Sequence, residues 1–174
     1  MTPAARVIVL SGVCGAGKSA VGAAVADRLG VPFIDADDLH PAANKAKMAR
    51  GLPLDDADRS PWLDAVAGAA AAGASVVACS ALRRRYRERL LEGVPNAFFV
   101  ELDVSRAELE RRVRQRSHEF MSPDLLDSQL ATLQPLASDE PGLRVAADDP
   151  LTDVVRAVLD QLQAHERGEH SSGR

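Results

Sequence analysis

The chain has 174 residues, of which 46% are hydrophobic and 26% are charged, and its formal net charge is −4 at pH 7. This composition is that of an ordinary globular protein long enough to bury a sizeable core. The sequence holds no run of about 18 apolar residues, which argues against a transmembrane helix, and the negative charge argues against a nucleic-acid-binding domain with a basic surface. Without an apolar signal segment at the start, we expect a cytoplasmic protein, in which Cys14 and Cys79 are reduced thiols.

Apolar runs typical of buried strands alternate with helical segments along the chain. We expect strands at residues 7–10, 33–34, 76–77, 98–102 and 143–146. We expect helices at residues 20–29, 61 to about 72, 105 to about 116, 122–133, and from 149 onward. This alternation predicts an α/β fold in which a five-stranded parallel sheet is flanked by helices.

Several helix ends carry sequence signals. Ser60 followed by Pro61 is typical of an N-cap and first helical residue, and Ser105 with Glu108 has the spacing of a capping box. The last helix presents one apolar stripe, which we expect to face the core rather than a partner: Val154, Val155, Val158, Leu159 and Leu162. We expect a single domain over residues 1–164 and a frayed or disordered polar tail over 165–174.

The most specific motif is a complete G-x-x-x-x-G-K-[ST] loop between the first strand and the first helix, the setting that a phosphate-binding loop needs. Its glycines let the backbone turn successive N–H groups inward, and the helix N-terminus adds partial positive charge. Lys18 is expected to reach the β- and γ-phosphates and Ser19 to bind Mg²⁺. A Gly-rich turn before a helix is the simpler alternative, but the flanks favour a nucleotide site. Its expected residues are Gly12, Val13, Cys14, Gly15, Ala16, Gly17, Lys18, Ser19 and Ala20.

Two carboxylates follow the second strand. If the strand alternation continues, Asp35 and Asp37 lie on the same side, beyond the carboxyl end where open α/β sheets bind ligands. One is suited to help hold Mg²⁺ and the other to accept a proton from an attacking hydroxyl. The alternative is a solvated acidic loop. His40 follows on the same loop, which suggests a hydrogen bond to a polar substrate, although a lone histidine is more often structural or exposed. No second His or Cys stands at the spacing of a metal site.

Several further segments resemble the small, thermoresistant-type bacterial gluconokinases. They are FIDADDLHP (33–41), Asn44, Lys47-Met48, GLPLDD (51–56), DRSPWL (58–63), CSALRRRYR (79–87) and LDSQLATL (126–133), and the resemblance covers residues 7–160. It implies a P-loop fold of the nucleoside-monophosphate-kinase type, similar to adenylate and shikimate kinases, with strand order 2-3-1-4-5 and a mobile lid at about 117–124. It also implies phosphorylation of D-gluconate at its 6-hydroxyl with ATP and Mg²⁺, and a homodimer.

The resemblance also implies roles for individual residues. Asp35 would support Mg²⁺ with Ser19, and Asp37 would be the catalytic base beside the catalytic Lys18. The substrate-binding residues would be Asp37, His40, Lys47, Arg59 and Arg83. Arginine suits this role because a guanidinium binds a carboxylate through two hydrogen bonds.

On the nucleotide side, Arg112 would lie on the adenine, and Arg116 would reach the phosphates when the lid closes and so act in catalysis. Pro150 belongs to the loop expected to frame the adenine. The lid segment Ser117-His118-Glu119 departs from the family pattern, because the histidine is displaced by one residue and a glutamate takes its place.

Several interpretations stay open. Trp62 is expected to pack beneath the substrate-binding helices rather than line the pocket, and most of residues 84–87 suit a solvated helix face. A shikimate-kinase-like enzyme for another small hydroxy acid is the nearest competing function. A non-catalytic nucleotide-binding regulator, or an RNA-associated factor that uses Arg83–Arg87, fits less well with the paired aspartates and the negative net charge.

Overall fold

The computed structural model describes residues 6–115 and 123–171. Its centre is a five-stranded sheet in the order β2-β3-β1-β4-β5, and every pair of neighbouring strands is parallel. The strands are β1 (Val7–Ser11), β2 (Phe33–Asp35), β3 (Ser75–Ala78), β4 (Ala97–Asp103) and β5 (Gly142–Ala146). The predicted α/β class and strand order are therefore confirmed.

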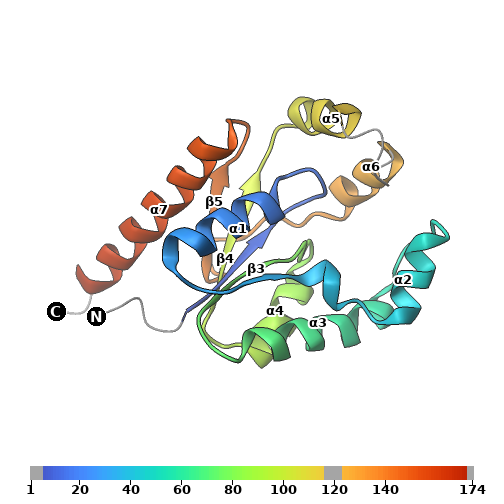
Figure 1. The fold of residues 1–174 in the computed structure, drawn as a ribbon, viewed down its shortest axis with the longest axis horizontal. Coiled ribbons are helices and arrows are strands. Elements are labelled where there is room, and N and C mark those ends of the chain that lie inside the picture. The colour runs from blue at the N-terminus through green and yellow to red at the C-terminus, as the bar shows by residue number, and fades with distance from the viewer. Residues whose placement is uncertain (1–5, 116–122, 172–174) are drawn as a thin grey trace.

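Helices cover both faces of this sheet (Figure 1). They are α1 (Lys18–Leu29), the 3₁₀ helix η1 (Ala36–Leu39), α2 (Ala42–Ala49), α3 (Asp56–Ala70), α4 (Arg84–Gly93), α5 (Arg106–Gln115), α6 (Pro123–Thr132) and α7 (Leu151–Ser171). Helices α1 and α7 lie on one face, and α3 and α4 on the other, while α2, α5 and α6 lie beyond the carboxyl ends of the strands (Figure 1). The open side of the molecule is thus the side on which parallel sheets bind ligands.

The hydrophobic core is divided into two layers by the sheet. Ile8 and Leu10 of β1 pack in the layer beneath α1 and α7, whereas Val7 and Val9 pack in the layer beneath α3 and α4. This division follows from the strand, because successive side chains point to opposite faces. Both faces are covered, which explains why the strands read as continuous apolar runs rather than as alternating ones.

Helix α3 begins earlier than the sequence predicted. Asp55 accepts a hydrogen bond from the Asp58 N–H at 2.8 Å and Asp58 accepts one from the Asp55 N–H at 3.0 Å, which together form a capping box. Pro61 therefore lies inside the helix and does not open it. The prediction of a start at Ser60-Pro61 was wrong because the aspartate pair caps the helix first.

The predicted capping box of α5 is only half formed. The Ser105 hydroxyl accepts from the Glu108 N–H at 3.3 Å. Glu108 does not return a bond to Ser105, since its carboxylate binds Arg111 and Arg112. Asp148 takes that place and accepts the Ser105 N–H at 3.0 Å, so the cap joins α5 to the loop after β5.

The apolar stripe of α7 faces the core, as predicted. Val154, Val155, Val158 and Leu162 are buried, and Leu159 packs partly buried against the same layer. The helix continues past His165, where we expected a frayed tail, and ends at Ser171. The His165 ring lies 4.7 Å from that of Phe98, which attaches this part of α7 to β4.

One close approach sets the spacing between α1 and β2. A Cβ built on Gly22 of α1 would lie 2.8 Å from Cε2 of Phe33 in β2, which is shorter than any ordinary carbon–carbon contact. Gly22 therefore lets the aromatic ring of β2 lie directly against the helix backbone.

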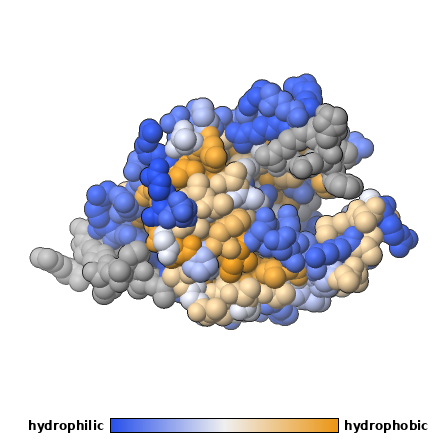
Figure 2. All heavy atoms as spheres, viewed as in Figure 1, coloured by the Kyte–Doolittle hydropathy of each residue, from blue (hydrophilic) through white to orange (hydrophobic). Residues whose placement is uncertain are grey.

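The space-filling view shows a recess on the side where the strands end, between α2 and the part of the molecule that carries α5 (Figure 2).

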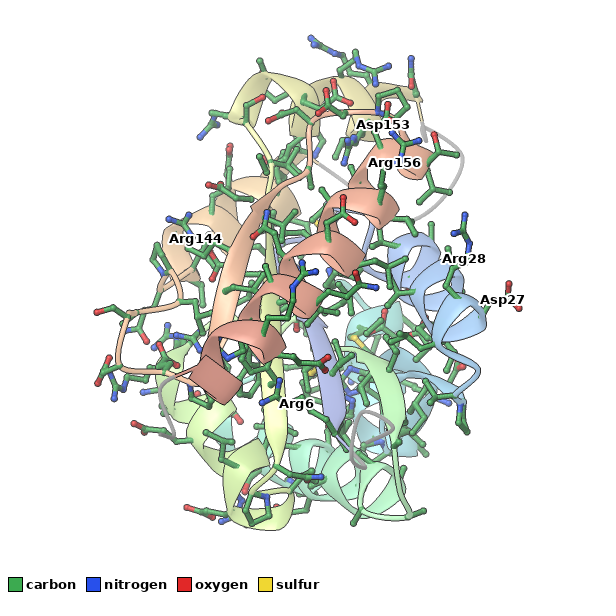
Figure 3. All side chains as sticks on the ribbon, turned by 90° about the vertical axis from the view of Figure 1, so that its left-hand side faces the viewer. Arg6, Asp27, Arg28, Arg144, Asp153 and Arg156 are labelled. Carbon is green, nitrogen blue, oxygen red and sulfur yellow. The ribbon has the colours of Figure 1, made fainter. Side chains whose placement is uncertain are left out.

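The edge strand β5 is held by Arg144, which bonds Glu101 at 2.8 Å and Asp103 at 3.1 Å. Figure 3 shows Arg144 on this edge and Asp153 and Arg156 on α7. None of the helices in residues 6–115 and 123–171 has the length and apolar character required to cross a membrane.

Candidate active site

The phosphate-binding loop connects β1 to α1 at the carboxyl edge of the sheet. Gly12, Gly15 and Gly17 have φ angles of 138°, 80° and 93°, which L side chains rarely adopt. A Cβ on Gly12 would also lie 3.1 Å from the Leu102 carbonyl oxygen. The glycines of the motif are thus required by the backbone path, and α1 begins directly after them at Lys18.

Lys18 lies over its own loop. Its ammonium donates to the Val13 carbonyl oxygen at 3.0 Å. Desolvation lowers the pKa of Lys18, and the negative charge of Asp37 opposes this shift. The lysine is therefore bonded to the phosphate-binding loop and lies within the electrostatic influence of Asp37.

Ser19, Asp35 and Asp37 are joined by hydrogen bonds. The Ser19 hydroxyl donates to Oδ2 of Asp35 at 2.8 Å, and the Asp37 N–H donates to Oδ1 of Asp35 at 3.0 Å. The expectation that strand alternation brings the aspartates together was wrong, because β2 ends at Asp35 and Asp37 lies in η1. Asp35 caps this 3₁₀ turn, and the cap brings the two residues together.

Asp37 is electrostatically distinct from an ordinary carboxylate. Desolvation raises its pKa most, and the negative charge of Asp35 raises it further, while Lys18 and His40 act in the opposite direction. A carboxylate whose charged form is disfavoured binds a proton more readily than a free aspartate. This is the property required of a general base.

His40 is fixed by two neighbours. Its ring stacks on Trp62 with centroids 4.3 Å apart and an interplanar angle of 12°, and Asn44 Nδ2 lies 3.3 Å from its Nδ1. Burial lowers the pKa of His40, which favours the neutral ring. The Trp62 N–H donates to the Ala36 carbonyl oxygen at 2.7 Å, and Trp62 is only 3% exposed. Trp62 is therefore a packing residue, and it supports both His40 and η1.

The segment between α2 and α3 is crosslinked by side chains. Lys47 forms an ion pair with Asp58 at 2.6 Å, and Asn44 donates to the Asp58 carbonyl oxygen at 2.8 Å. Arg59 donates to the Leu54 carbonyl oxygen and to the Tyr86 hydroxyl, the latter at 3.4 Å. Lys47 and Arg59 are thus both engaged with protein groups.

Arg83 precedes α4 and is half-buried. Its Nε is buried and has no hydrogen-bond partner within the described part of the chain. A buried donor without a partner is costly, so this guanidinium is suited to receive an anionic oxygen.

Arg87 of α4 forms a second contact in this region: it pairs with Glu140 at 2.6 Å and donates to the Ala81 carbonyl oxygen at 3.0 Å. Both partners of this pair are buried, with side chains 1% and 5% exposed.

Arg112 connects two loops on the nucleotide side. It donates to the carbonyl oxygens of Gly15 and Ala16 in the phosphate-binding loop, at 3.2 and 3.4 Å, and to that of Ala147 at 2.7 Å. Ala147 and Pro150 belong to the connection between β5 and α7. Arg112 therefore binds the connection that also contains Pro150, through Ala147. Arg116 and lid residues 117–122 lie outside the described residues.

The oxygen donors beside the phosphate-binding loop suit a magnesium ion. Ser19 offers a hydroxyl and Asp35 a carboxylate, which are the hard oxygen ligands that Mg²⁺ takes alongside water and phosphate oxygens. The described residues contain no group of three or more His, Cys, Asp or Glu side chains able to hold a metal by themselves. The chemistry therefore fits a metal that is shared with a bound nucleotide.

The sequence interpretation assigned no role to several residues that organise the site. Asn44 was one of the gluconokinase-like positions, but only its hydrogen bonds show that it joins His40 to α3. Tyr86 donates to Asp56 at 2.7 Å and so joins α4 to α3. Gln129 accepts the Cys14 N–H at 2.6 Å. A polar residue on the apolar face of a helix was the signal available for Gln129. Cys14 and Cys79 are free thiols.

Comparison with known proteins identifies relatives of the whole chain. A family model described as an AAA domain matches residues 7–136. A gluconokinase from Gluconobacter oxydans is 42% identical over 92% of this chain and 93% of that protein. The thermoresistant gluconokinase of Escherichia coli is 41% identical over 91% and 94%.

Solved structures show the same likeness. The crystal structure of a gluconokinase from Sinorhizobium meliloti 1021 has a TM-score of 0.87 at 40% identity and covers 97% of this chain and 98% of its own. A shikimate kinase from Bacteroides thetaiotaomicron has a TM-score of 0.63 at 20% identity, over 92% and 99% of the two chains. The second likeness shows a shared fold only.

Proposed function

This chain belongs to the gluconokinase family, and we propose that it transfers the γ-phosphoryl group of ATP to the 6-hydroxyl of D-gluconate, giving 6-phospho-D-gluconate and ADP. One observation carries the proposal beyond family membership. Ser19, Asp35 and Asp37 form a hydrogen-bonded series beside the phosphate-binding loop, and the pKa of Asp37 is raised. This arrangement supports the assignment of Ser19 and Asp35 to Mg²⁺ and of Asp37 to the catalytic base.

On the donor side, we assign the phosphates of ATP to the loop from Gly12 to Ala20. The N–H groups of Gly12, Cys14 and Ala16 are not part of this assignment, because they donate to Ser80, Gln129 and Val13. Lys18 would then lie close to the transferring phosphoryl group and balance its charge. Ser19 and Asp35 would hold Mg²⁺, which supplies positive charge to the phosphate oxygens when bound. Arg112, already bonded to the loop backbone, would border the adenine together with Pro150.

On the acceptor side, Asp37 would accept the proton of the attacking hydroxyl. Neutral His40, held against Trp62, would orient the substrate by a hydrogen bond. The hydroxyl oxygen then forms its bond to the γ-phosphorus as the bond to the ADP oxygen breaks. This is direct in-line transfer, so no covalent enzyme intermediate is required.

The carboxylate of the substrate is assigned to the arginines. The unpartnered, buried Nε of Arg83 supports a contact with an anion, and Arg59 would supply a second guanidinium. Lys47 would join them only after exchanging its bond to Asp58 for one to the substrate. We further propose one kinase domain over residues 1–164 with a lid at about 117–124, which brings Arg116 to the phosphates, and a homodimer.

A panel of acceptors tests this assignment. ADP release is coupled to NADH oxidation and measured with D-gluconate, shikimate and other aldonic acids at equal concentration. We expect D-gluconate to give the highest kcat/KM. Better phosphorylation of shikimate would favour the competing hydroxy-acid kinase, and ATP binding without turnover on any acceptor would favour a regulator.

A further inference from the structure

One peptide unit of the phosphate-binding loop is held at both ends by side chains. The Val13 carbonyl oxygen accepts from the Lys18 ammonium at 3.0 Å, and the N–H of the next residue, Cys14, donates to Oε1 of Gln129 at 2.6 Å. The Val13–Cys14 peptide is trans, since the described residues contain no cis peptide bond. In a trans peptide the C=O and N–H bonds point in opposite directions. Lys18 and Gln129 therefore hold opposite edges of the same plane.

Gln129 reaches this position because of where it lies on α6. Leu126 is buried, Leu130 and Leu133 pack partly buried against the same core layer, and these residues share one helix face with Gln129. Gln129 is thus a polar residue on the apolar face of α6. A backbone N–H can only donate, so the amide oxygen of Gln129 must face Cys14.

The segment directly after α6 is anchored on the acceptor side. The Gln134 N–H donates to the Leu82 carbonyl oxygen at 2.8 Å, and Arg87 donates to the Gln134 carbonyl oxygen at 3.1 Å. Leu82 directly precedes Arg83, the residue with the unpartnered buried nitrogen. The short segment formed by α6 and the two residues after it therefore contacts both the loop that precedes Lys18 and the loop that presents Arg83.

We propose that Gln129 is a positioning residue for Lys18: by accepting the Cys14 N–H, it keeps the Val13 carbonyl turned toward the ammonium, so the placement of the lysine depends on α6. The Ala16 N–H also donates to the Val13 oxygen, at 3.2 Å, so the turn fixes the carbonyl end of the peptide while Gln129 fixes the N–H end. Without Gln129, the Cys14 N–H loses its acceptor and the peptide plane gains freedom to rotate.

Three substitutions at one position test this proposal. Gln129→Met keeps the length of the side chain but lacks a strong hydrogen-bond acceptor. Gln129→Ala removes both the length and the acceptor, and Gln129→Glu keeps an acceptor oxygen. Thr132→Val is the matched control, because it also removes one hydrogen bond from α6, that of Thr132 to the Ser128 carbonyl oxygen. That bond does not involve the phosphate-binding loop.

The first readout needs no substrate. Amide hydrogen exchange of Cys14, followed by NMR in the nucleotide-free protein, is expected to accelerate about tenfold in the Met and Ala variants. Acylation of Lys18 at fixed pH is expected to accelerate with it, because an ammonium that loses an acceptor gives up its proton more readily. Gln129→Glu and Thr132→Val should retain the wild-type exchange rate of Cys14, and Thr132→Val should also retain the wild-type acylation rate of Lys18.

The second readout, which rests on the proposed function, is turnover with ATP and D-gluconate. We expect kcat to fall about tenfold in the Met and Ala variants, with a smaller change in ADP affinity and an unchanged melting temperature, and to recover in Gln129→Glu. A wild-type kcat in Gln129→Met, equal losses in all three variants, or losses that follow melting temperature would each overturn the proposal. If the wild-type protein does not phosphorylate gluconate, the proposed function fails, while Cys14 exchange and Lys18 acylation still decide the role of Gln129.

Discussion

The two halves of the site are built in different ways. On the donor side, charged side chains bind backbone carbonyls: Lys18 binds Val13, and Arg112 binds Gly15, Ala16 and Ala147. The acceptor side also has carbonyl contacts, but it adds a network in which side chains bind or stack on other side chains: His40 on Trp62, Lys47 on Asp58, and Tyr86 on Asp56.

This difference teaches where the identity of the substrate is set. A backbone cradle needs only a few fixed residue types, chiefly glycine, lysine and serine, and it recognises phosphates common to many substrates. A network of side chains depends on each member, so a change at one position moves others. We therefore expect substitutions on the acceptor side to alter specificity and those on the donor side to alter turnover with any acceptor.

The largest expected effect comes from Asp37, at the junction of the two halves. Asp37→Asn should lower kcat about 10²- to 10⁴-fold, since the general base is lost, and leave the Kd for ATP nearly unchanged. Steady-state kinetics and calorimetry measure the two quantities. The matched control is Asp38→Asn, an exposed carboxylate on the same 3₁₀ turn. An Asp37→Asn enzyme with normal turnover would show that the proton leaves by another route.

The next effect tests the support beneath the acceptor side. Arg87→Met should lower the free energy of unfolding by about 3–5 kcal/mol, because it leaves Glu140 as an unpaired buried charge. Urea denaturation followed by circular dichroism gives the value. Arg84→Met, which breaks the exposed pair with Asp139, should change stability little. Replacing both members, Arg87→Met with Glu140→Leu, should restore most of the loss, and failure to do so would assign the cost to the carbonyl contacts of Arg87.

A smaller effect is expected at the contact between Trp62 and η1. Trp62→Phe keeps an aromatic ring against His40 but removes the donor to the buried Ala36 carbonyl oxygen. The cost should be about 1–3 kcal/mol of unfolding free energy, together with a modest rise in KM for gluconate. A kcat reduced without any change in KM would mean that Trp62 acts on the transfer step rather than on substrate placement.

The smallest effect concerns pH. Because the base must be deprotonated, the raised pKa of Asp37 shifts the acid limb of the kcat/KM profile to higher pH. The lowered pKa of Lys18 shifts the alkaline limb to lower pH. The pH range of activity should therefore be narrower at both ends than free side chains would give.

The same shift affects stability, because a group whose pKa is raised by folding loses its stabilising effect as pH rises through that pKa. Asp37→Asn should accordingly stabilise the protein at neutral pH relative to wild type, as thermal melts at several pH values would show.

The sequence predicted the backbone of the phosphate-binding loop, but only part of the geometry on the acceptor side. The loop from Gly12 to Ser19 could be recognised from its glycine positions and its flanking segments, whereas the strand order was implied only by the resemblance to the gluconokinases. The start of α3 predicted from Ser60-Pro61 is too late, because Asp55 and Asp58 cap the helix before Pro61. The position of Asp37 was misjudged because a 3₁₀ turn, not a strand, follows Asp35.

Long-range contacts were beyond reach of the residues alone. The Lys47–Asp58 pair is 11 residues apart in sequence and the Cys14–Gln129 bond is 115 residues apart, and no local pattern specifies either. Gln129 could have been noticed as a polar residue on an apolar helix face. Its partner could not, because the fold alone brings α6 to the phosphate-binding loop.

Gly22 makes the metal-binding geometry a matter of steric spacing. It lies one helical turn after Ser19, and the ring that it admits belongs to Phe33, two residues before Asp35 in the same strand. The 2.8 Å distance between the Ser19 hydroxyl and Asp35 therefore depends on the absence of a side chain at Gly22. A Cβ at position 22 would push α1 away from Phe33 in β2. The distance between the Ser19 hydroxyl and the Asp35 carboxylate would then increase, although neither residue had been changed.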